Sequence, residues 1–186
     1  MQNRINKVLI VCSNYDFYML EEDGRIDERI FYEYTSLNLR YPPSFIHANS
    51  AKRAILTLAS DKIDLVITWL DIGNYRAFET SKLIREEFPK VPIAALSHYS
   101  SELRKKLEKE TPGVIDLVFH WNGNSDIFLA IIKLTEDRMN AERDINEVGV
   151  KAILLVEDSL RYYSIKPIWV PQESPETYIV FSVNSI

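Results

Sequence analysis

The chain has 186 residues, of which 46% are hydrophobic and 26% are charged, a composition typical of a globular protein. Its formal net charge of −5 gives no basic surface for phosphates and argues against nucleic-acid binding. One cysteine, Cys12, cannot form an internal disulfide, which favours a reducing compartment. The length suits one well-buried domain with an appendage. Residues 1–7 lack a signal-peptide pattern and no run is long enough for a membrane span, so we expect a cytoplasmic protein that does not enter membranes.

Short apolar runs alternate with helical patterns along the first three quarters of the chain. In chain order the predicted elements are a strand over residues 7–12, a helix over 15–39 interrupted at Gly24, a strand over 44–48, a helix over 51–60, a strand over 64–70, a helix over 75–88, a strand over 92–97, a charged helix over 100–109, a strand over 114–121 and a helix over 125–143. Asn49 and Ser50 offer an N-cap for the second helix. Phe78, Leu83 and Ile84 predict the apolar face of the third.

Strands joined by helical crossovers of this length run parallel to one another. Five such units predict an α/β fold with a doubly wound five-stranded parallel sheet of the flavodoxin or CheY-like type, in the strand order 2-1-3-4-5. In this order the winding direction changes between strands 1 and 3. We therefore expect functional residues to gather where these two strands end.

The segment DLVI at residues 64–67, followed after one turn by AFETSKLIREEFPKVPIAALS at 77–97, is more specific than the order of elements. It resembles the stretch from the third to the fourth strand of CheY-like receiver domains of response regulators, and the resemblance covers about three quarters of the chain. It implies a non-enzymatic module of two-component, phosphorelay-type signal transduction. A working receiver has two acidic residues after strand 1 that hold Mg²⁺, a phosphoacceptor aspartate ending strand 3, a Ser or Thr ending strand 4 and a Lys ending strand 5.

The acidic positions of that pattern are largely missing here. The pair after strand 1 falls among Cys12, Ser13 and Asn14, none of which is charged. Asp16 follows, and we expect it to reach a metal only if the loop is rearranged. The acceptor position falls near Thr68 or Trp69, while the nearest carboxylate, Asp71, is displaced by two or three residues and also suits a loop residue or helix cap.

The remaining two positions give one match. Ser97 matches the switch hydroxyl, although a serine after a strand is also an ordinary turn residue. The lysine is replaced by His120 and Trp121. Trp69 and Trp121 would both project near the carboxyl edge of the sheet, either as plain core residues or as aromatic packing that fills the polar pocket.

Three functions remain open from the sequence. The first is a pseudo-receiver that acts by protein–protein contact and uses no cofactor. The alternative is a phosphoaccepting receiver in which Asp71 takes the phosphoryl group and Asp16 helps to hold Mg²⁺. A small flavodoxin-like enzyme that binds a nucleotide or flavin is the third, and the absence of Gly-rich phosphate-binding loops after strands 1 and 3 argues against it.

The C-terminal residues begin a second pattern of the same kind. We expect a receiver-like domain over residues 1–138, a helical connector over 139–150, and over 151–186 the start of a second receiver-like domain that is truncated or diverged. The segment KAILLVEDS at 151–159 is an apolar strand that ends in the acidic pair Glu157 and Asp158.

Two longer segments, at residues 21–43 and 148–164, resemble the N-terminal region of phosphoenolpyruvate-synthase-like multidomain bacterial proteins. This resemblance implies protein partners, namely downstream modules of a larger protein and a histidine kinase. A homodimer is a further possibility, through the fourth helix and fifth strand or through the helix around Met139.

Overall fold

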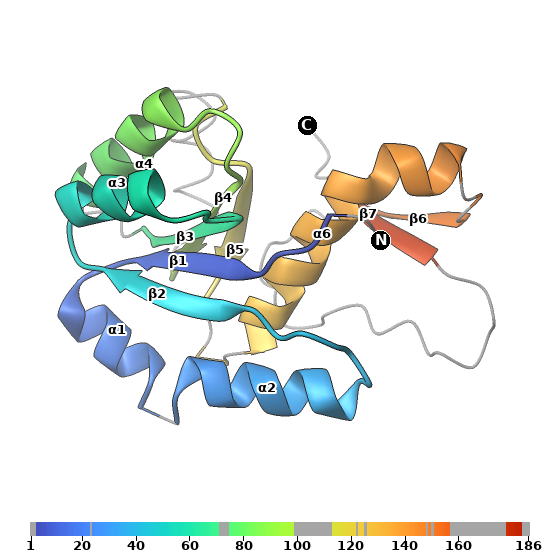
Figure 1. The fold of residues 1–186 in the computed structure, drawn as a ribbon, viewed down its shortest axis with the longest axis horizontal. Helices are drawn as coiled ribbons and strands as arrows, with labels where there is room; N and C mark the ends of the chain where they lie inside the picture. The colour runs from blue at the N-terminus through green and yellow to red at the C-terminus, as the bar shows by residue number, and fades with distance from the viewer. Residues whose placement is uncertain are drawn as a thin grey trace.

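In the computed structural model of the protein, the central feature is a five-stranded parallel sheet in the order β2-β1-β3-β4-β5 (Figure 1). The strands are β1 (Lys7–Val11), β2 (Ser44–Ala48), β3 (Leu65–Trp69), β4 (Ile93–Ser97) and β5 (Leu117–His120). The structure describes residues 3–22, 24–70, 75–98, 113–121, 123–124, 126–147, 149, 151–156 and 178–183. In β1, Leu9 lies opposite Ile46 of β2 and Val66 of β3. The predicted fold class and strand order are confirmed.

Helices cover both faces of this sheet. They are α1 (Asn14–Leu20), α2 (Ile26–Ser36), α3 (Ala51–Ser60), α4 (Tyr75–Glu87) and α6 (Asp126–Asn146). The predicted helix over 15–39 is two helices, α1 and α2, separated near Gly24, where the backbone has a φ of 120° that glycine adopts without strain. The predicted charged helix over 100–109 lies outside the described residues.

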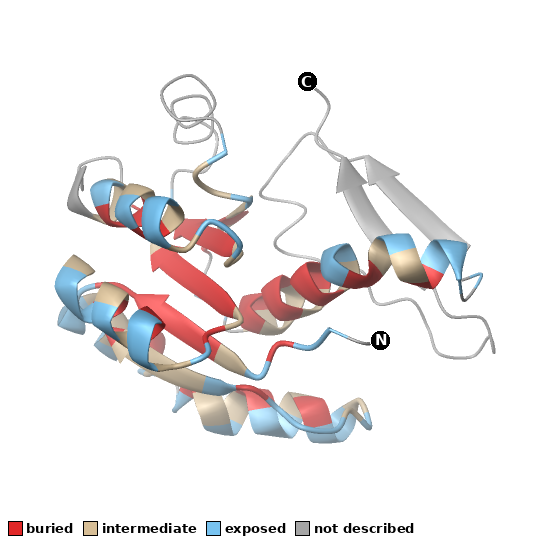
Figure 2. Cartoon of the chain, turned by 45° about the horizontal axis from the view of Figure 1, so that its top comes forward, coloured by how far each residue is buried: buried red, intermediate tan, exposed pale blue. Residues whose placement is uncertain are grey.

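Successive residues of β1 supply two separate cores, because side chains of a strand alternate between its faces. Ile10 packs in a cluster with buried residues of α1, α2 and α6. Leu9 packs on the other face with Ala54 of α3 and Ile84 of α4. Figure 1 shows α1 and α2 below the sheet and α3 and α4 above it, and Figure 2 shows the strands of the sheet coloured red as buried.

One predicted face is wrong in part. Ile84 is fully buried, but Leu83 is 43% exposed and Phe78 is only partly buried. The residues that share the inner face of α4 with Ile84 are Thr80 and Ser81, both buried. The Ser81 hydroxyl donates to the Ala77 carbonyl at 3.0 Å, so its polar group is satisfied inside the helix.

Polar side chains of α6 fix the start of the chain. Glu136 and Asn140 are buried, and Glu136 Oε1 accepts a hydrogen bond from the Ile5 backbone N–H at 3.0 Å. Asn140 accepts from the Asn3 N–H and donates to the Asn3 carbonyl, both at 2.8 Å. Lys133 Nζ completes the set, 2.7 Å from Glu136 Oε2. Side chains of α6 therefore hold the backbone of residues 3–5, just before β1, by hydrogen bonds.

The C-terminal residues contain two further strands. β6 (Lys151–Val156) pairs in parallel with β7 (Tyr178–Val183) in a separate two-stranded sheet. A strand is thus present where the sequence predicted the opening of a second unit, while Glu157 and Asp158 lie outside the described residues. The division at 138 and 150 stays a prediction, and α6 runs through the first boundary as one helix. No helix in the described ranges is both long and apolar enough to cross a membrane.

Candidate functional site

The candidate site lies at the carboxyl edge of the five-stranded sheet. Because the strands are parallel, β1, β3, β4 and β5 all end at this edge. Backbone hydrogen bonds continue past the last paired residues: the Trp121 N–H donates to the Ser97 carbonyl at 2.9 Å, and the Leu70 N–H donates to the Leu96 carbonyl at 2.8 Å. The strand ends are therefore held in fixed positions relative to one another.

An aromatic cluster occupies the edge between β3 and β5. Its members are Trp69, His98, Trp121 and Phe128. The ring centroids of Trp69 and Trp121 lie 5.4 Å apart at an interplanar angle of 65°, and those of Trp69 and His98 lie 5.3 Å apart at 69°. Trp121 also contacts Phe128, with centroids 6.0 Å apart. These distances and edge-to-face angles are the favourable geometry for aromatic pairs. Trp121 also belongs to the buried core cluster and Trp69 packs against it, so the two tryptophans contact each other and are core residues at once, and their filling of a polar pocket stays a prediction.

The end of β1 carries an uncharged thiol. Cys12 is buried, and burial raises its pKa to about 12, with the Asp16 carboxylate adding to the shift. A thiol with this pKa stays protonated at neutral pH, so Cys12 offers neither a negative charge nor a nucleophile there.

The carboxylate of Asp16 is engaged at the start of α1. The Ser13 hydroxyl accepts a hydrogen bond from the Asp16 N–H at 3.0 Å and donates one to Asp16 Oδ2 at 2.7 Å. Ser13 is thereby the N-cap of α1, and Asp16 stabilises the first turn, where a negative charge is favourable. This is a local structural role that the sequence did not predict.

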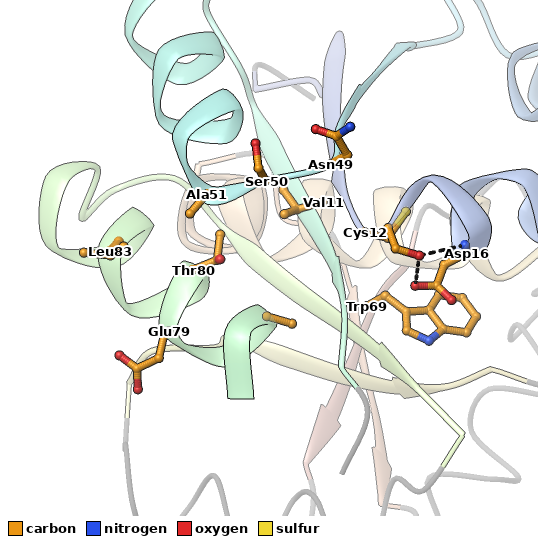
Figure 3. A pocket seen from close by; sticks show the side chains of 12 residues that line it. Val11, Cys12, Asp16, Asn49, Ser50, Ala51, Trp69, Glu79, Thr80 and Leu83 are labelled. Atoms are coloured by element: carbon orange, nitrogen blue, oxygen red, sulfur yellow. Dashed lines mark hydrogen bonds between the residues drawn. The ribbon is translucent and has the colours of Figure 1, made fainter. Parts of the chain in front are cut away.

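A pocket of about 570 Å³ opens beside these residues, at the change in winding direction between β1 and β3. Its walls come from the end of β1, the start of α3, Trp69 and the first turns of α4 (Figure 3). Asn49 and Thr80 belong to this wall, and sequence reasoning missed both. The predicted strand order could have found them, because it places the start of α3 and of α4 at this edge.

The pocket contains two carboxylates that do not converge. Figure 3 shows Asp16 and Glu79 at opposite ends of it, and Glu79 is paired with Lys82 at 3.5 Å on the surface of α4. Among the described residues, no group of three or more His, Cys, Asp or Glu side chains is arranged to hold a metal ion. Mg²⁺ prefers several hard oxygen ligands, and the described residues do not provide such a set.

Of the other predicted site residues, only Ser97 lies within the part of the chain that the structure describes. Ser97 is fully buried at the end of β4, between the two tryptophans along the edge, and its role as a switch hydroxyl stays a prediction. Asp71, the acceptor candidate, lies outside the described residues, as do Glu157 and Asp158. The structure brings Asp16 and Trp69 to one pocket, while Ser97 lies at the same edge of the sheet and does not line that pocket.

Comparisons with known proteins identify the fold. No protein-family model and no curated protein matches the chain. Among solved structures, it is similar to the signal receiver domain of a putative Luxo repressor protein from Vibrio parahaemolyticus, with a TM-score of 0.54 and 16% identity over 77% of this chain and 98% of that chain. It is also similar to a two-component response regulator from Clostridium difficile, with a TM-score of 0.51 and 18% identity over 73% and 98% of the two chains. At such identities the likeness defines architecture alone, and we conclude that the chain has a CheY-like receiver fold.

Proposed function

We propose that the protein is a pseudo-receiver: a non-enzymatic, cytoplasmic module of phosphorelay-type signal transduction that acts by contact with protein partners and does not accept a phosphoryl group itself. The observation that carries this proposal is the aromatic cluster. Trp69 and Trp121 stand at the ends of β3 and β5, where a phosphoaccepting receiver has an aspartate and a lysine, and they pack against each other.

The charge at this edge supports the proposal. A phosphorylated side chain carries close to two negative charges and needs cations and hydrogen-bond donors around it. The cluster offers two indole rings, one phenyl ring and a single imidazole, that of the exposed His98, and the neighbouring Cys12 thiol is neutral. A phosphoryl group placed among these rings would lose its hydration without gaining the charged partners that offset that loss. The edge is therefore suited to packing and unsuited to holding a dianion.

The polar groups near β1 support the same conclusion. Asp16 lies five residues past the end of β1, and its Oδ2 already accepts a hydrogen bond from the Ser13 hydroxyl. Moving it toward a bound cation would break the bond that Asp16 Oδ2 accepts from the Ser13 hydroxyl, and a hydrogen bond to a charged group typically contributes about 1.5 kcal/mol or more. Phosphorylation at Asp71 with Mg²⁺ held by Asp16 is the alternative function, and it requires this rearrangement.

The partners we propose are protein modules, namely downstream modules of a larger protein and a histidine kinase, with a second copy of the chain as a further candidate. The net charge of −5 favours protein partners over nucleic acids. The residues from 151 onward are proposed to begin a second receiver-like unit, for which the β6–β7 pair supplies two parallel strands.

The test is intact-mass analysis after incubation with acetyl phosphate and Mg²⁺, with a phosphoaccepting receiver treated in parallel as positive control. We expect no added phosphoryl group. A thermal-shift series with Mg²⁺ and fluoroberyllate provides a second readout, and we expect no stabilisation. A phosphoryl adduct that disappears in Asp71→Asn would overturn the proposal and establish the alternative, in which Asp71 is the acceptor.

A further inference from the structure

Large aromatic side chains are exposed along the outer surfaces of α1 and α2. Tyr15, Tyr18 and Tyr32 are each 70% exposed, Phe31 is 54% exposed and Met19 is 43% exposed. Two exposed glutamates lie beside them, Glu22 in the turn just after α1 and Glu28 on α2. We call these seven residues the aromatic–acidic face. Its members are Tyr15, Tyr18, Met19, Glu22, Glu28, Phe31 and Tyr32.

Helix geometry forces these side chains outward. Residues three, four and seven positions apart share one face of a helix. On α2, Ile26, Ile30 and Tyr34 form the buried row, Phe31 flanks this row with more than half of its side chain exposed, and the more exposed Tyr32 lies on the opposite side of the helix. The rings of Phe31 and Tyr32 contact each other edge to face, with centroids 6.1 Å apart.

Helix α1 also has one buried side and one exposed side. Phe17 points inward and stacks on His47 of β2, with ring centroids 4.1 Å apart and an interplanar angle of 10°. His47 Nε2 is in turn 3.0 Å from the Cys12 carbonyl, so this stack fixes the rotation of α1 about its axis. Tyr15 and Tyr18 therefore face solvent because the inner side of the helix is already committed.

Both outer rows lie on one side of the molecule. The inner rows of α1 and α2 enter the same core cluster, on one face of the sheet, and Figure 1 shows the two helices following each other along that side. Figure 2 shows exposed residues alternating with buried ones along α2. The five large apolar side chains of the aromatic–acidic face thus lie on two helices that cover the same side of the sheet.

The charge of this region identifies the chemistry of the partner. Residues 14–41 contain seven acidic and three basic residues, which accounts for four of the five net negative charges of the chain. Arg25 is already paired with Asp27 at 2.9 Å. Glu22 and Glu28 have no hydrogen bond or ion pair through their side chains in the part of the chain that the structure describes, so they are available to external cations.

An acidic surface with exposed rings selects among classes of partner. Arginine and lysine gain both an ion pair with a glutamate and a cation–π contact with a tyrosine or phenylalanine ring. A second copy of the chain would bring like charges together, and anionic lipids and nucleic acids would be repelled for the same reason. Tyrosine and phenylalanine are also among the side chains enriched at the centres of protein interfaces.

From these observations we propose that the aromatic–acidic face docks a basic, amphipathic segment of a partner protein, with its apolar side chains on the rings and its arginines or lysines on the glutamates. This inference deepens the proposed function, because it names the surface and the partner chemistry that contact-based signalling requires. It does not depend on whether the chain accepts a phosphoryl group.

The test uses the full chain and two synthetic probes of equal charge. One is an amphipathic peptide of arginine and leucine, and the other replaces each leucine with serine. Binding is followed by amide chemical-shift changes and calorimetry. We expect the first peptide to bind with shift changes concentrated in α1 and α2, and the second to bind at least tenfold more weakly. No binding of the first peptide at millimolar concentration would overturn the proposal.

Variants localise the contact. We expect the triple variant Tyr18→Ser, Phe31→Ser, Tyr32→Ser to lower the affinity at least about tenfold, as loss of aromatic anchors does at interfaces. The matched control is Leu56→Ser on α3, which removes a side chain that is 59% exposed on the opposite side of the sheet. We expect it to change the affinity less than twofold. Equal losses in both variants would overturn the proposal.

Two further experiments test the role of the glutamates and the competing classes of partner. The double variant Glu22→Gln, Glu28→Gln should weaken binding about threefold and flatten its dependence on salt. Dimerisation that the triple variant abolishes, or binding to vesicles of anionic lipid, would assign the face to those partners and refute the basic segment. The phosphoryl-transfer assay on the same preparation separates the two proposals, since an adduct with intact peptide binding refutes only the pseudo-receiver.

Discussion

The partly buried carboxylate of Asp137 on α6 should make the stability of the protein depend on pH, and this dependence can be measured. Its side chain is partly buried, and its pKa is raised to about 6 by burial, then by the nearby Glu136 carboxylate, while Lys133 opposes the shift and Asp144 adds to it. The folded chain therefore binds more protons than the unfolded chain between about pH 4 and pH 6. In this window stability falls as pH rises, and above it the whole penalty of the charged carboxylate is present.

The raised pKa of Asp137 sets the size of its effect on the free energy of unfolding. An aspartate with an ordinary pKa of 3.8 that titrates near 6 is destabilised by at most about 3 kcal/mol when charged, since one unit corresponds to about 1.4 kcal/mol. The side chain retains some contact with water, so we expect about 1–2 kcal/mol. Asp137→Asn removes the charge and has nearly the same helix propensity, and it should stabilise the protein by this amount at pH 7.5 and leave it nearly unchanged at pH 4.

Urea denaturation of parent and variant at pH 4 and pH 7.5 measures this difference. Glu142→Gln is the matched control, because Glu142 lies on the same helix, carries the same charge and is exposed. We expect its stability to follow that of the parent at both pH values. If Asp137→Asn shows the same pH dependence as the parent, or is less stable at pH 7.5, the reasoning from burial is wrong.

Three further predictions concern the site and the N-terminal contact. Trp121→Ala should lower the free energy of unfolding by about 3 kcal/mol, because it removes a buried ring that contacts Trp69; a loss below about 1 kcal/mol in urea denaturation would contradict the packing. Asn140→Ala should cost about 1–2 kcal/mol and speed hydrogen exchange at the Asn3 amide, which it leaves without its acceptor; unchanged exchange would show that the bond does not form in solution. Cys12 should react with iodoacetamide at pH 8 about a thousandfold more slowly in the folded than in the unfolded chain, given the rise of its pKa from 9.0 to about 12; equal rates would show an accessible thiolate.

Elements defined by local signals were predicted well from the sequence. The predicted spans 44–48 and 51–60 coincide with β2 and α3. The boundary of α3 is set by Ser50, whose hydroxyl accepts from the Arg53 N–H at 3.4 Å, a bond within one turn of the chain. The meeting of Trp69 and Trp121 was foreseeable for a related reason, since the strand order alone places both strand ends at one edge.

Features that depend on distant segments could not be predicted. Glu136 and Asn140 have the polar character of a solvent-facing row, and they are buried because backbone groups of residues 3–5 bond to them across more than 130 positions. Leu83 was assigned to the core together with Ile84 because periodicity cannot distinguish adjacent helical positions. In the structure Ile84 is buried as predicted, but Thr80 and Ser81 are buried with it and Leu83 is exposed. Asp16 was weighed as a metal ligand, and only the structure shows its bond to Ser13.

The tie between residues 3–5 and α6 also determines when the domain can be completed during synthesis. β1 can pair with β2 and β3 once about seventy residues have emerged, but the face of the sheet that carries Ile10 is covered by α6, which begins at Asp126. Until then a nascent chain exposes part of its apolar strand surface to solvent. Such contacts between residues far apart in sequence slow folding, and exposed strands of this kind favour aggregation. The bond between the Ile5 N–H and Glu136 can form only after α6 has emerged, so it belongs to the step that covers this apolar surface.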